Sequence, residues 1–455
     1  MTGTDASLGG EAPSSDVVAP ELASRLLAAG QAHLVEHAAG LRRDARASYV
    51  AELASVAWER LGAALHAVSP PPPPDLRPPE ALTLRRRHNE GGIGRRLALV
   101  GRQLLAAGKV ATVLLAGGQG TRLGHPGPKG LFVLGPSPDR TLYAILFERV
   151  AAAGRSAGTP VPLVILVGRD TEDATRVVVA DARRFGLDPS LVRVLRQGEM
   201  PAVDDGGRAL LAAPGRLALA PDGHGGLVDA LTRSSTLDWL RERGVEWLTT
   251  FQVDNALGRP LDPEFLGWAV ERRAVAAGKA VRKRTPSEKV GVFARGIDGR
   301  VRIVEYSELP AEGAELLQLG SIAVHAWHLP WLAAVTSAPG FALPWHRARK
   351  RVPFLATDGT VRTPASENAT KWEQFLFDLL PMAPRVAIVE VNRAREFAPL
   401  KNATGEDSPE TARAAVTAEI RRWHREAGLD VTEGPLDLRP LEADGPDDLR
   451  VPTPG

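Results

Sequence analysis

The sequence of 455 residues contains no cysteine. Disulfide bonds, zinc sites built from thiolates and cysteine nucleophiles are therefore excluded. Any chemistry in this chain has to rely on carboxylates, amines, hydroxyls, imidazoles or a hard metal ion that takes oxygen ligands.

Long hydrophobic runs are also missing. Apolar stretches such as residues 161–168 are far shorter than the roughly 20 residues that a membrane-spanning helix needs. Residues 1–16 have neither the basic start nor the apolar middle of a signal peptide, and they predict a disordered leader. We therefore expect a cytoplasmic protein without a membrane span.

The sequence carries little excess charge of either sign. Its 56 Lys and Arg residues balance 54 Asp and Glu residues, which leaves a formal net charge of +2. Proteins that bind nucleic acids usually present a strongly basic surface to the phosphates. The balance therefore predicts no nucleic-acid partner, and nothing in the composition indicates the oligomeric state.

The spacing of apolar residues changes along the chain. Up to residue 68 it is helical, and the proline-rich stretch 69–80 ends it, because a proline run cannot continue a helix. After a further helix over 94–107, short runs rich in Val and Leu alternate with helical segments, which is typical of open α/β sheets covered on both faces. Beyond residue 279 the strand-like segments favour antiparallel pairing, so we expect a mixed sheet.

These observations predict an α/β protein with a Rossmann-like central domain. With 44% hydrophobic residues the chain is long enough for two or three domains. We expect an N-terminal leader and helical domain over 1–107, a central domain over 108–392 and a small C-terminal domain over 393–455. A capped helix is predicted within the last of these.

A glycine-rich stretch, "LLAGGQGTRLGHPGPKG" at residues 114–130, follows the first apolar strand. Glycine turns of this kind expose backbone N–H groups that bind phosphate oxygens. The Walker A spacing fails because Pro128 precedes the lysine and Gly130 follows it, and the dinucleotide fingerprint fails because Leu123 occupies the third glycine position. A loop with two fixed cations remains.

Those cations are Arg122, whose planar guanidinium suits bidentate phosphate contact, and Lys129, which supplies a point charge. Together with the glycines they predict a site for a polyphosphate. The alternative is that the glycines only form a tight turn and that both cations are solvated. The density of Gly, Thr, Arg and Lys in this stretch favours the phosphate site.

The same stretch resembles the signature L-A-G-G-x-G-T-R-L-G…P-K-G of the UDP-sugar pyrophosphorylase family. The resemblance is strongest to the eukaryotic-type UDP-N-acetylhexosamine pyrophosphorylase branch and covers roughly residues 104–416. It includes further motifs in the same order: "RQGEMPA" (196–202), "APDGHGGL" (220–227), "FQVDN" (251–255), "VGVFAR" (290–295), "VEYSEL" (304–309), "KWEQFLFD" (371–378) and "FAPLKNATGEDSPETAR" (397–413).

This resemblance implies an enzyme, a nucleotidyltransferase that converts UTP and a sugar 1-phosphate into a UDP-sugar and pyrophosphate by direct, Mg²⁺-assisted displacement. It implies catalytic roles for Arg122 and Lys129 at the leaving pyrophosphate and for Lys401 at the reacting phosphates. It also implies a set of nucleotide-binding residues: Ala116, Gly117, Gly118, Gly120, Thr121, Gln197, Met200, Pro201 and Gly223.

Asp254 is the candidate metal ligand. It follows an apolar run that predicts a buried strand, and a carboxylate at the end of such a strand is suited to Mg²⁺, which completes its shell with phosphate oxygens and water. A turn or helix N-cap aspartate is the alternative from spacing alone. The match to the V-D-N motif of the family favours the metal.

The resemblance assigns a third set of residues to the sugar phosphate: His224, Gly291, Glu305, Ser321 and Lys371. For Lys371 the alternative is a solvated residue near the start of a helix. The hexosamine branch usually has asparagines at the positions of His224, Ser321 and Val324, and those amides help to grip the sugar and its N-acetyl group. A hexose 1-phosphate such as glucose 1-phosphate, and a sugar-nucleotide-binding protein without turnover, therefore remain alternatives.

Overall fold

The structure, a computed structural model, describes residues 17–67, 75–89, 92–309, 313–431 and 436–450. The predicted leader over 1–16 and residues 68–74 of the proline-rich stretch lie outside the described residues. None of the described helices has both the length and the apolar character needed to cross a bilayer.

The chain forms two compact units, and each is built from separated stretches. Unit 1 contains residues 1–69, 198–223 and 344–374, and unit 2 contains the rest of the chain. This division differs from the expected three consecutive domains. The N-terminal helices are completed by two later stretches, and residues 393–455 belong to the same unit as the main sheet.

Unit 1 combines four short helices with small two-stranded sheets. The helices bury their apolar faces against Met200, Trp345 and Trp372, which come from the two later stretches. The side-chain amide of the buried Gln31 also donates to the carbonyl of Gly207. The elements are α1 Pro20–Ala28, α2 Ala32–Ala39, α3 Arg43–Ser55, α4 Trp58–His66, β4 Glu199–Pro201, β5 Leu211–Ala213, β6 Arg216–Leu217, β7 Leu219–Pro221, β13 His346–Lys350, β14 Phe354–Leu355, β15 Val361–Arg362 and β16 Ala369–Glu373.

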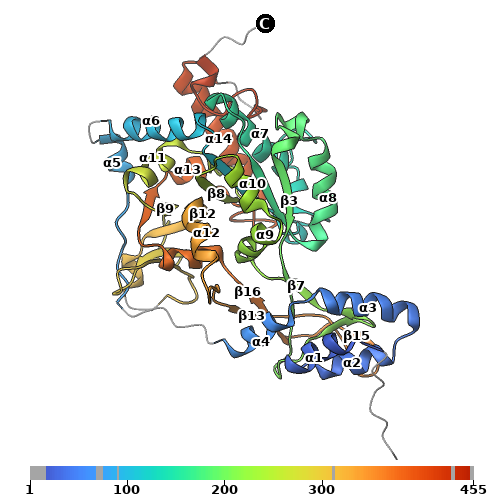
Figure 1. Ribbon diagram of the computed structural model, residues 1–455. Coiled ribbons are helices and arrows are strands. Elements are labelled where there is room, and N and C mark those ends of the chain that lie inside the picture. Colours follow the sequence, from blue (N-terminus) through green and yellow to red (C-terminus); the bar gives the residue numbers. More distant parts are fainter. Residues whose placement is uncertain (1–16, 68–74, 90–91, 310–312, 432–435, 451–455) are drawn as a thin grey trace, which may run out of the picture. The chain divides into compact units, whose positions relative to one another are not determined.

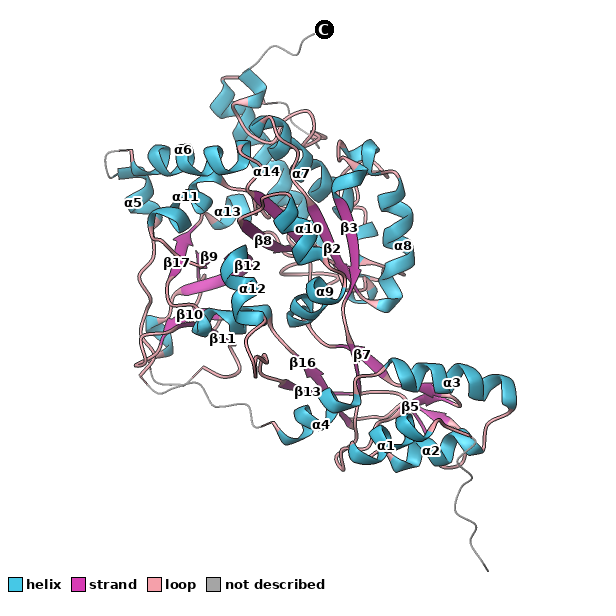
Figure 2. Ribbon diagram, viewed as in Figure 1, coloured by secondary structure: helices cyan, strands magenta, loops and turns pink. Residues whose placement is uncertain are grey.

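Unit 2 contains a nine-stranded mixed sheet within its described residues, which confirms the predicted fold class (Figures 1 and 2). Its strands are β1 Val110–Leu115, β2 Leu163–Val167, β3 Val192–Arg196, β8 Trp247–Gln252, β9 Ala276–Arg282, β10 Val292–Arg295, β11 Val301–Val304, β12 Leu319–His328 and β17 Val386–Glu390. β1 pairs in parallel with β2 and β8, and β2 pairs in parallel with β3. β10, β11 and β12 add the expected antiparallel pairs.

Alternate residues of β1 enter two different apolar clusters, one on each face of the sheet. Val110 and Leu114 belong to the first cluster, and Val113 and Leu115 belong to the second. Because side chains alternate across a strand, a strand buried on both faces must be apolar throughout. All six residues of β1 are indeed buried, as its sequence predicts.

The helices of unit 2 cover both faces of this sheet. α6, α7 and α11 supply residues to the first cluster, and α9, α10 and α12 supply residues to the second. The predicted capped helix is α14, with Ser408 at its N-cap and Gly428 after its last turn. The helices are α5 Leu84–Asn89, α6 Ile93–Ala106, α7 Leu142–Ala157, α8 Arg169–Ala180, α9 Leu227–Arg233, α10 Thr236–Glu242, α11 Pro263–Glu271, α12 Leu329–Thr336, α13 Arg393–Glu396 and α14 Pro409–Ala427.

α6 and α11 approach each other closely through two glycines. A Cβ atom on Gly101 would lie 1.9 Å from the carbonyl oxygen of Pro263, and one on Gly267 would lie 2.0 Å from that of Leu97. Each helix therefore presents backbone, not a side chain, to the other. This packing requires glycine at both positions.

We expect Gly101→Ala to lower the free energy of unfolding by about 3 kcal/mol, because the two helices must separate to admit the methyl group. Urea denaturation followed by circular dichroism measures this change. Gly62→Ala in α4 is the control, since a Cβ there meets no atom within 4 Å. That variant should keep or slightly raise the stability, because alanine is the better helix former. Equal stability of the two variants would contradict the proposed packing.

Candidate active site

The candidate site begins where two neighbouring parallel strands end. β1 and β8 pair in register, with Leu115 opposite Gln252. Parallel strands end at the same edge of a sheet, where α/β proteins bind their ligands. The glycine loop that follows β1 and the segment that follows β8 and carries Asp254 are therefore neighbours.

The glycine loop folds back on itself. The N–H of Gly120 donates to the carbonyl of Gly127 at 2.8 Å, and the N–H of Lys129 donates to the carbonyl of Gly118 at 3.0 Å. Thr121 begins a short 3₁₀ turn that ends at Gly124, whose φ of 70° favours glycine. Gly117 and Gly118 donate no backbone N–H bond to another described residue. Their N–H groups are thus available to an anion.

Gln197 lies directly against the start of this loop. A Cβ on Gly117 would be 2.4 Å from the Gln197 side-chain oxygen, so a larger residue at 117 would require the Gln197 side chain to move. Ala116 is anchored in the sheet, since its N–H donates to the carbonyl of Leu166 at 2.7 Å. The structure therefore brings together the unit 2 members of the predicted nucleotide set: Ala116, Gly117, Gly118, Gly120, Thr121 and Gln197.

Lys129, Asp254 and Lys401 converge at the same edge of the sheet. The Lys129 ammonium lies 3.9 Å from the Asp254 carboxylate and donates to the carbonyl of Leu400 at 3.1 Å. The N–H of Leu400 donates in turn to the carbonyl of Asp254 at 2.9 Å. Lys401, the next residue, lines the same cavity as Asp254 and also lies 3.9 Å from Asp407.

Arg122 stands apart from this group. Its side chain is exposed and makes no ion pair with any other described residue. It is also absent from the lining of the cavity that contains Asp254. Arg122 is thus an unpaired cation on the outer part of the glycine loop.

The cavity next to Asp254 has a volume of about 290 Å³ and gathers the sugar-phosphate candidates of unit 2. Gly291 faces Glu305, because a Cβ on the glycine would lie 2.9 Å from a carboxylate oxygen. The carbonyl of Gly291 accepts a bond from the N–H of Ser321 at 2.8 Å. His224 lines the same cavity.

His224 is held in an aromatic cluster. Its Nδ1 accepts a bond from the N–H of Leu376 at 3.0 Å, and its ring centroid lies 5.4 Å from that of Phe375 and 5.7 Å from that of Phe377. The Leu376 bond requires Nδ1 to be unprotonated. His224 and the two phenylalanines therefore form one wall of a cavity that is also lined by the polar side chains of Asp254, Glu305 and Lys401.

Ser321 and Val324, which stand in β12 where the hexosamine branch usually has asparagines, lie on opposite sides of the strand. Ser321 lines the cavity, whereas Val324 is only 1% exposed and belongs to the apolar core. Because side chains alternate across a strand, residues three apart face opposite sides, and Ile322, Val324 and Ala326 all belong to the first apolar cluster. The register shift between Ser321 and His325 does not change this alternation. Only Ser321 can therefore bear directly on a ligand in the cavity.

The remaining predicted residues, Met200, Pro201, Gly223 and Lys371, belong to unit 1. Met200 is buried in the core of that unit. Gly223 has φ 83°, and a Cβ on it would lie 2.4 Å from the carbonyl oxygen of Gln374. This contact alone requires glycine at residue 223, without any nucleotide. Lys371 lies on strand β16, opposite Ala348, so the expectation of a helix start was wrong.

Two residues that the motifs did not single out support the site. Asn255 is 3% exposed, and its amide donates to the carbonyl of Glu396 at 2.7 Å and accepts from the N–H of Ala398 at 2.9 Å. His325 is 4% exposed and lines the cavity, and its Nε2 has no hydrogen-bond partner among the described residues. The V-D-N motif could have indicated Asn255, whereas no sequence signal indicated His325.

Asp254 is suited to a metal ion that takes most of its ligands from elsewhere. Its carboxylate makes no hydrogen bond to another described residue and has the Lys129 ammonium as a distant partner. A search of the described residues for three or more clustered His, Cys, Asp or Glu side chains finds no group that could hold a metal alone. One carboxylate completed by phosphate oxygens and water is a common arrangement for Mg²⁺.

Burial lowers the pKa of His325 from 6.5 to about 3, and the neighbouring His224 adds to the effect. The unfolded chain takes up the proton near pH 6.5, whereas the folded chain resists it until about pH 3. The stability that this histidine contributes is therefore complete above pH 6.5 and is lost as the pH falls toward 3.

We expect His325→Gln to reduce the loss of unfolding free energy between pH 7.5 and pH 5.0 by about 2 kcal/mol, because glutamine has no proton to take up in this range. Urea denaturation of the two proteins at both pH values measures the difference. An equal loss in the variant and the natural protein would mean that His325 titrates normally.

Comparison with known proteins supports the resemblance to the UDP-sugar pyrophosphorylase family. Residues 92–405 match the family model described as UTP–glucose-1-phosphate uridylyltransferase. The human UDP-N-acetylhexosamine pyrophosphorylase-like protein 1 is 37% identical over 436 residues, which cover 90% of this chain and 86% of that protein. The UDP-N-acetylglucosamine pyrophosphorylase of Saccharomyces cerevisiae is 33% identical over 354 residues, which cover 74% of each chain.

A solved structure indicates the same family as the sequence relatives do. The uridine diphosphate N-acetylglucosamine pyrophosphorylase from Trypanosoma brucei, in complex with an inhibitor, matches with a TM-score of 0.80 and 27% identity. The match covers 97% of this chain and 95% of that chain. The predicted resemblance is thus confirmed, and the chain belongs to the UTP–glucose-1-phosphate uridylyltransferase family, which is the UDP-sugar pyrophosphorylase family indicated by its motifs.

Proposed function

We propose that this protein transfers the uridylyl group of UTP to a sugar 1-phosphate, with a UDP-sugar and pyrophosphate as products. The convergence of Lys129, Asp254 and Lys401 between a glycine loop and the cavity next to Asp254 is the observation that carries the proposal. The names of the curated relatives in human and yeast support the same chemistry.

In this reaction an oxygen of the sugar phosphate forms a bond to the α-phosphorus of UTP. The bond from that phosphorus to the bridging oxygen breaks, and pyrophosphate leaves with its electron pair. Both reactants are anions, so the protein has to supply alignment and positive charge. No covalent intermediate with the protein is needed, which fits a chain without cysteine.

The glycine loop and the lysines supply what this chemistry needs. The free N–H groups of Gly117 and Gly118 would hold the triphosphate, and Lys129 and Arg122 would stabilise the leaving pyrophosphate. Lys401, beside Asp254, would neutralise the reacting phosphates. For the uracil we propose Gln197, and for the sugar phosphate the cavity residues of unit 2. Lys371, on β16 of unit 1, stays a predicted ligand of the sugar phosphate.

We further propose that Asp254 binds Mg²⁺ together with phosphate oxygens of the substrates. When bound, the ion supplies positive charge to the triphosphate and helps to orient it. The Asp254 carboxylate at the edge of the cavity, which accepts no hydrogen bond from another described residue and lies 3.9 Å from the Lys129 ammonium, supports this assignment.

Lys129→Gln should lower kcat by about a hundredfold, because the variant loses a cation that is already positioned for the leaving group. The release of pyrophosphate from UTP, Mg²⁺ and a panel of sugar 1-phosphates measures the rate. Lys109→Gln is the control, since Lys109 pairs with Glu246 away from the cavity. If the natural protein binds UTP but releases no pyrophosphate with any sugar phosphate, a non-catalytic binding function replaces the proposal.

For the sugar we propose an N-acetylhexosamine 1-phosphate, with N-acetylglucosamine 1-phosphate as the first choice. The apolar wall of His224, Phe375 and Phe377 suits the methyl group of an acetamido substituent, and Glu305 suits the sugar hydroxyls. Glucose 1-phosphate is the second candidate. It is favoured by Ser321, whose hydroxyl is engaged by the N–H of Ala323 at 3.2 Å and which replaces an amide.

Ser321→Asn should raise the ratio of kcat/KM for N-acetylglucosamine 1-phosphate over glucose 1-phosphate about fivefold, the worth of one ordinary hydrogen bond. Pyrophosphate release with each sugar phosphate gives the two constants. Ser307→Asn, which is exposed and outside the cavity lining, is the matched control. An unchanged ratio in the Ser321 variant would show that residue 321 does not select the sugar.

A further inference from the structure

Arg149, from the middle of α7, is a buried cation that contacts the segment carrying Asp254. It is 7% exposed, and its guanidinium donates to the carbonyls of Ala256 at 2.7 Å and Gly258 at 3.2 Å. These bonds fix Ala256 and Gly258, which lie two and four residues after Asp254. We call residues 254–258 the Asp254 loop.

A carboxylate from near the C-terminal end of the chain keeps Arg149 in this position. Asp444 accepts a bond from the Arg149 Nε at 3.1 Å, and its side chain is 12% exposed. Burial lowers the pKa of Arg149, whereas the Asp444 charge opposes that shift. A buried guanidinium of this kind needs its counter-ion to stay charged and in place.

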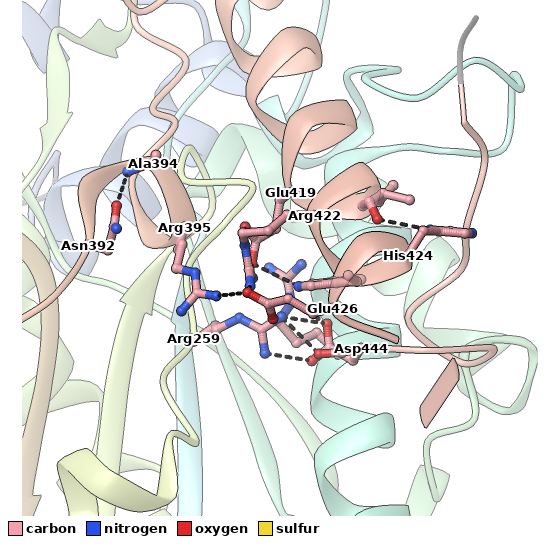
Figure 3. Close-up of polar contacts among 12 residues, drawn as sticks. Arg259, Asn392, Ala394, Arg395, Glu419, Arg422, His424, Glu426 and Asp444 are labelled. Carbon is pink, nitrogen blue, oxygen red and sulfur yellow. Dashed lines mark hydrogen bonds and ion pairs between the residues drawn. The ribbon is translucent and has the colours of Figure 1, made fainter. Parts of the chain in front are cut away.

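Arg259, which directly follows the Asp254 loop, joins the same carboxylate. Its guanidinium donates to the backbone carbonyl of Asp444 at 2.9 Å and to the carboxylate at 3.3 Å (Figure 3). Figure 3 also shows Arg395, Glu419, Arg422 and Glu426 gathered next to this pair. Asp444 thus connects one arginine that binds the loop with another at the loop's end.

The segment around Asp444 is itself tied to α7. Asp437 accepts a bond from Arg140 at 2.7 Å, and Arg439 pairs with Glu148, which is 1% exposed. Residues 437–448, which we call the C-terminal strap, therefore run along the residue pair Glu148 and Arg149. The strap is held by ion pairs at Asp437, Arg439 and Asp444.

Apolar side chains do not fully surround the residues that form these ion pairs. A cavity of about 500 Å³ is lined by Arg149, Arg259 and Asp444, so close-packed side chains do not enclose them on every side. Ala256 and Leu257 pack into the first apolar cluster. On the side of the cavity, Arg149 adds directional hydrogen bonds to the loop's backbone carbonyls.

We propose that Asp444 is a positioning residue for the uridylyltransferase reaction, which acts through Arg149 to hold the Asp254 loop at the edge of the sheet. This inference rests on the proposed function. Asp444 touches no reacting group, and its effect on the rate is carried by the placement of the Asp254 carboxylate. Small displacements of a binding group can lower a rate by large factors.

Asp444→Asn tests the proposal in the full-length protein, because asparagine keeps the shape and the acceptor oxygen but loses the charge. We expect kcat to fall about tenfold, with the KM for the sugar phosphate unchanged within about twofold. The Mg²⁺ concentration for half-maximal activity should rise, and amide hydrogen exchange across residues 253–259 should become faster. Asp447→Asn, whose exposed side chain pairs with Arg450, is the matched control for all four readouts.

A normal kcat, normal Mg²⁺ dependence and unchanged exchange in Asp444→Asn would overturn the proposal, as would an equal change in the Asp447 control. If Asp444→Asn does not fold, Arg259→Gln decides, since it loosens Asp444 without removing the partner of Arg149. That variant should show the same pattern with about a threefold lower kcat. If the natural protein has no activity, the proposed function fails. The hydrogen-exchange measurement would still show whether Asp444 holds the Asp254 loop in place.

Discussion

The parallel pairing of β1 with β8 is the constraint on which the candidate site depends. Because the two strands end opposite each other at Leu115 and Gln252, the glycine loop and the Asp254 loop start from one edge of the sheet. The alternation of apolar residues on both faces of β1 holds that edge in place. Lys129 and Asp254 then come within reach of each other although the sequence separates them widely.

Cationic side chains at such an edge keep their positions only if the backbone that carries them is held in place. Asn255 connects the Asp254 loop to the chain around Ala398, and Arg149 connects it to α7. Both side chains are buried and bind backbone atoms, so they act on the position of the loop and not on a ligand. The site thus consists of a few exposed groups on backbone that is fixed by buried polar side chains.

The sequence predicted those parts of the site that local patterns encode. The apolar run of β1, the glycines after it and the V-D-N motif after β8 each follow from neighbouring residues, and their side-by-side placement follows from the rule for parallel strands. The role of Val324 was not accessible in the same way, because the sequence does not show which face of β12 lines the cavity, and alternation then places Val324 on the face opposite Ser321.

Contacts between distant segments could not be predicted either. Nothing near Arg149 in the sequence indicates that Asp444 is its partner, and the lowered pKa of His325 depends on burial that only the folded chain provides. Gly223 is a related case, since the resemblance pointed to a nucleotide whereas the backbone of Gln374 already excludes a side chain. The motifs identified residues of the site, whereas the contacts that require each residue are visible only in the folded structure.

Because unit 1 is built from separated stretches of the chain, its parts leave the ribosome at different times. The apolar faces of α1 to α4 emerge before Trp345 and Trp372, which help to cover them and are translated about three hundred residues later. Nascent chains therefore carry an incompletely buried apolar surface while much of unit 2 is still being made. Newly synthesised protein is most exposed to misassociation during that interval.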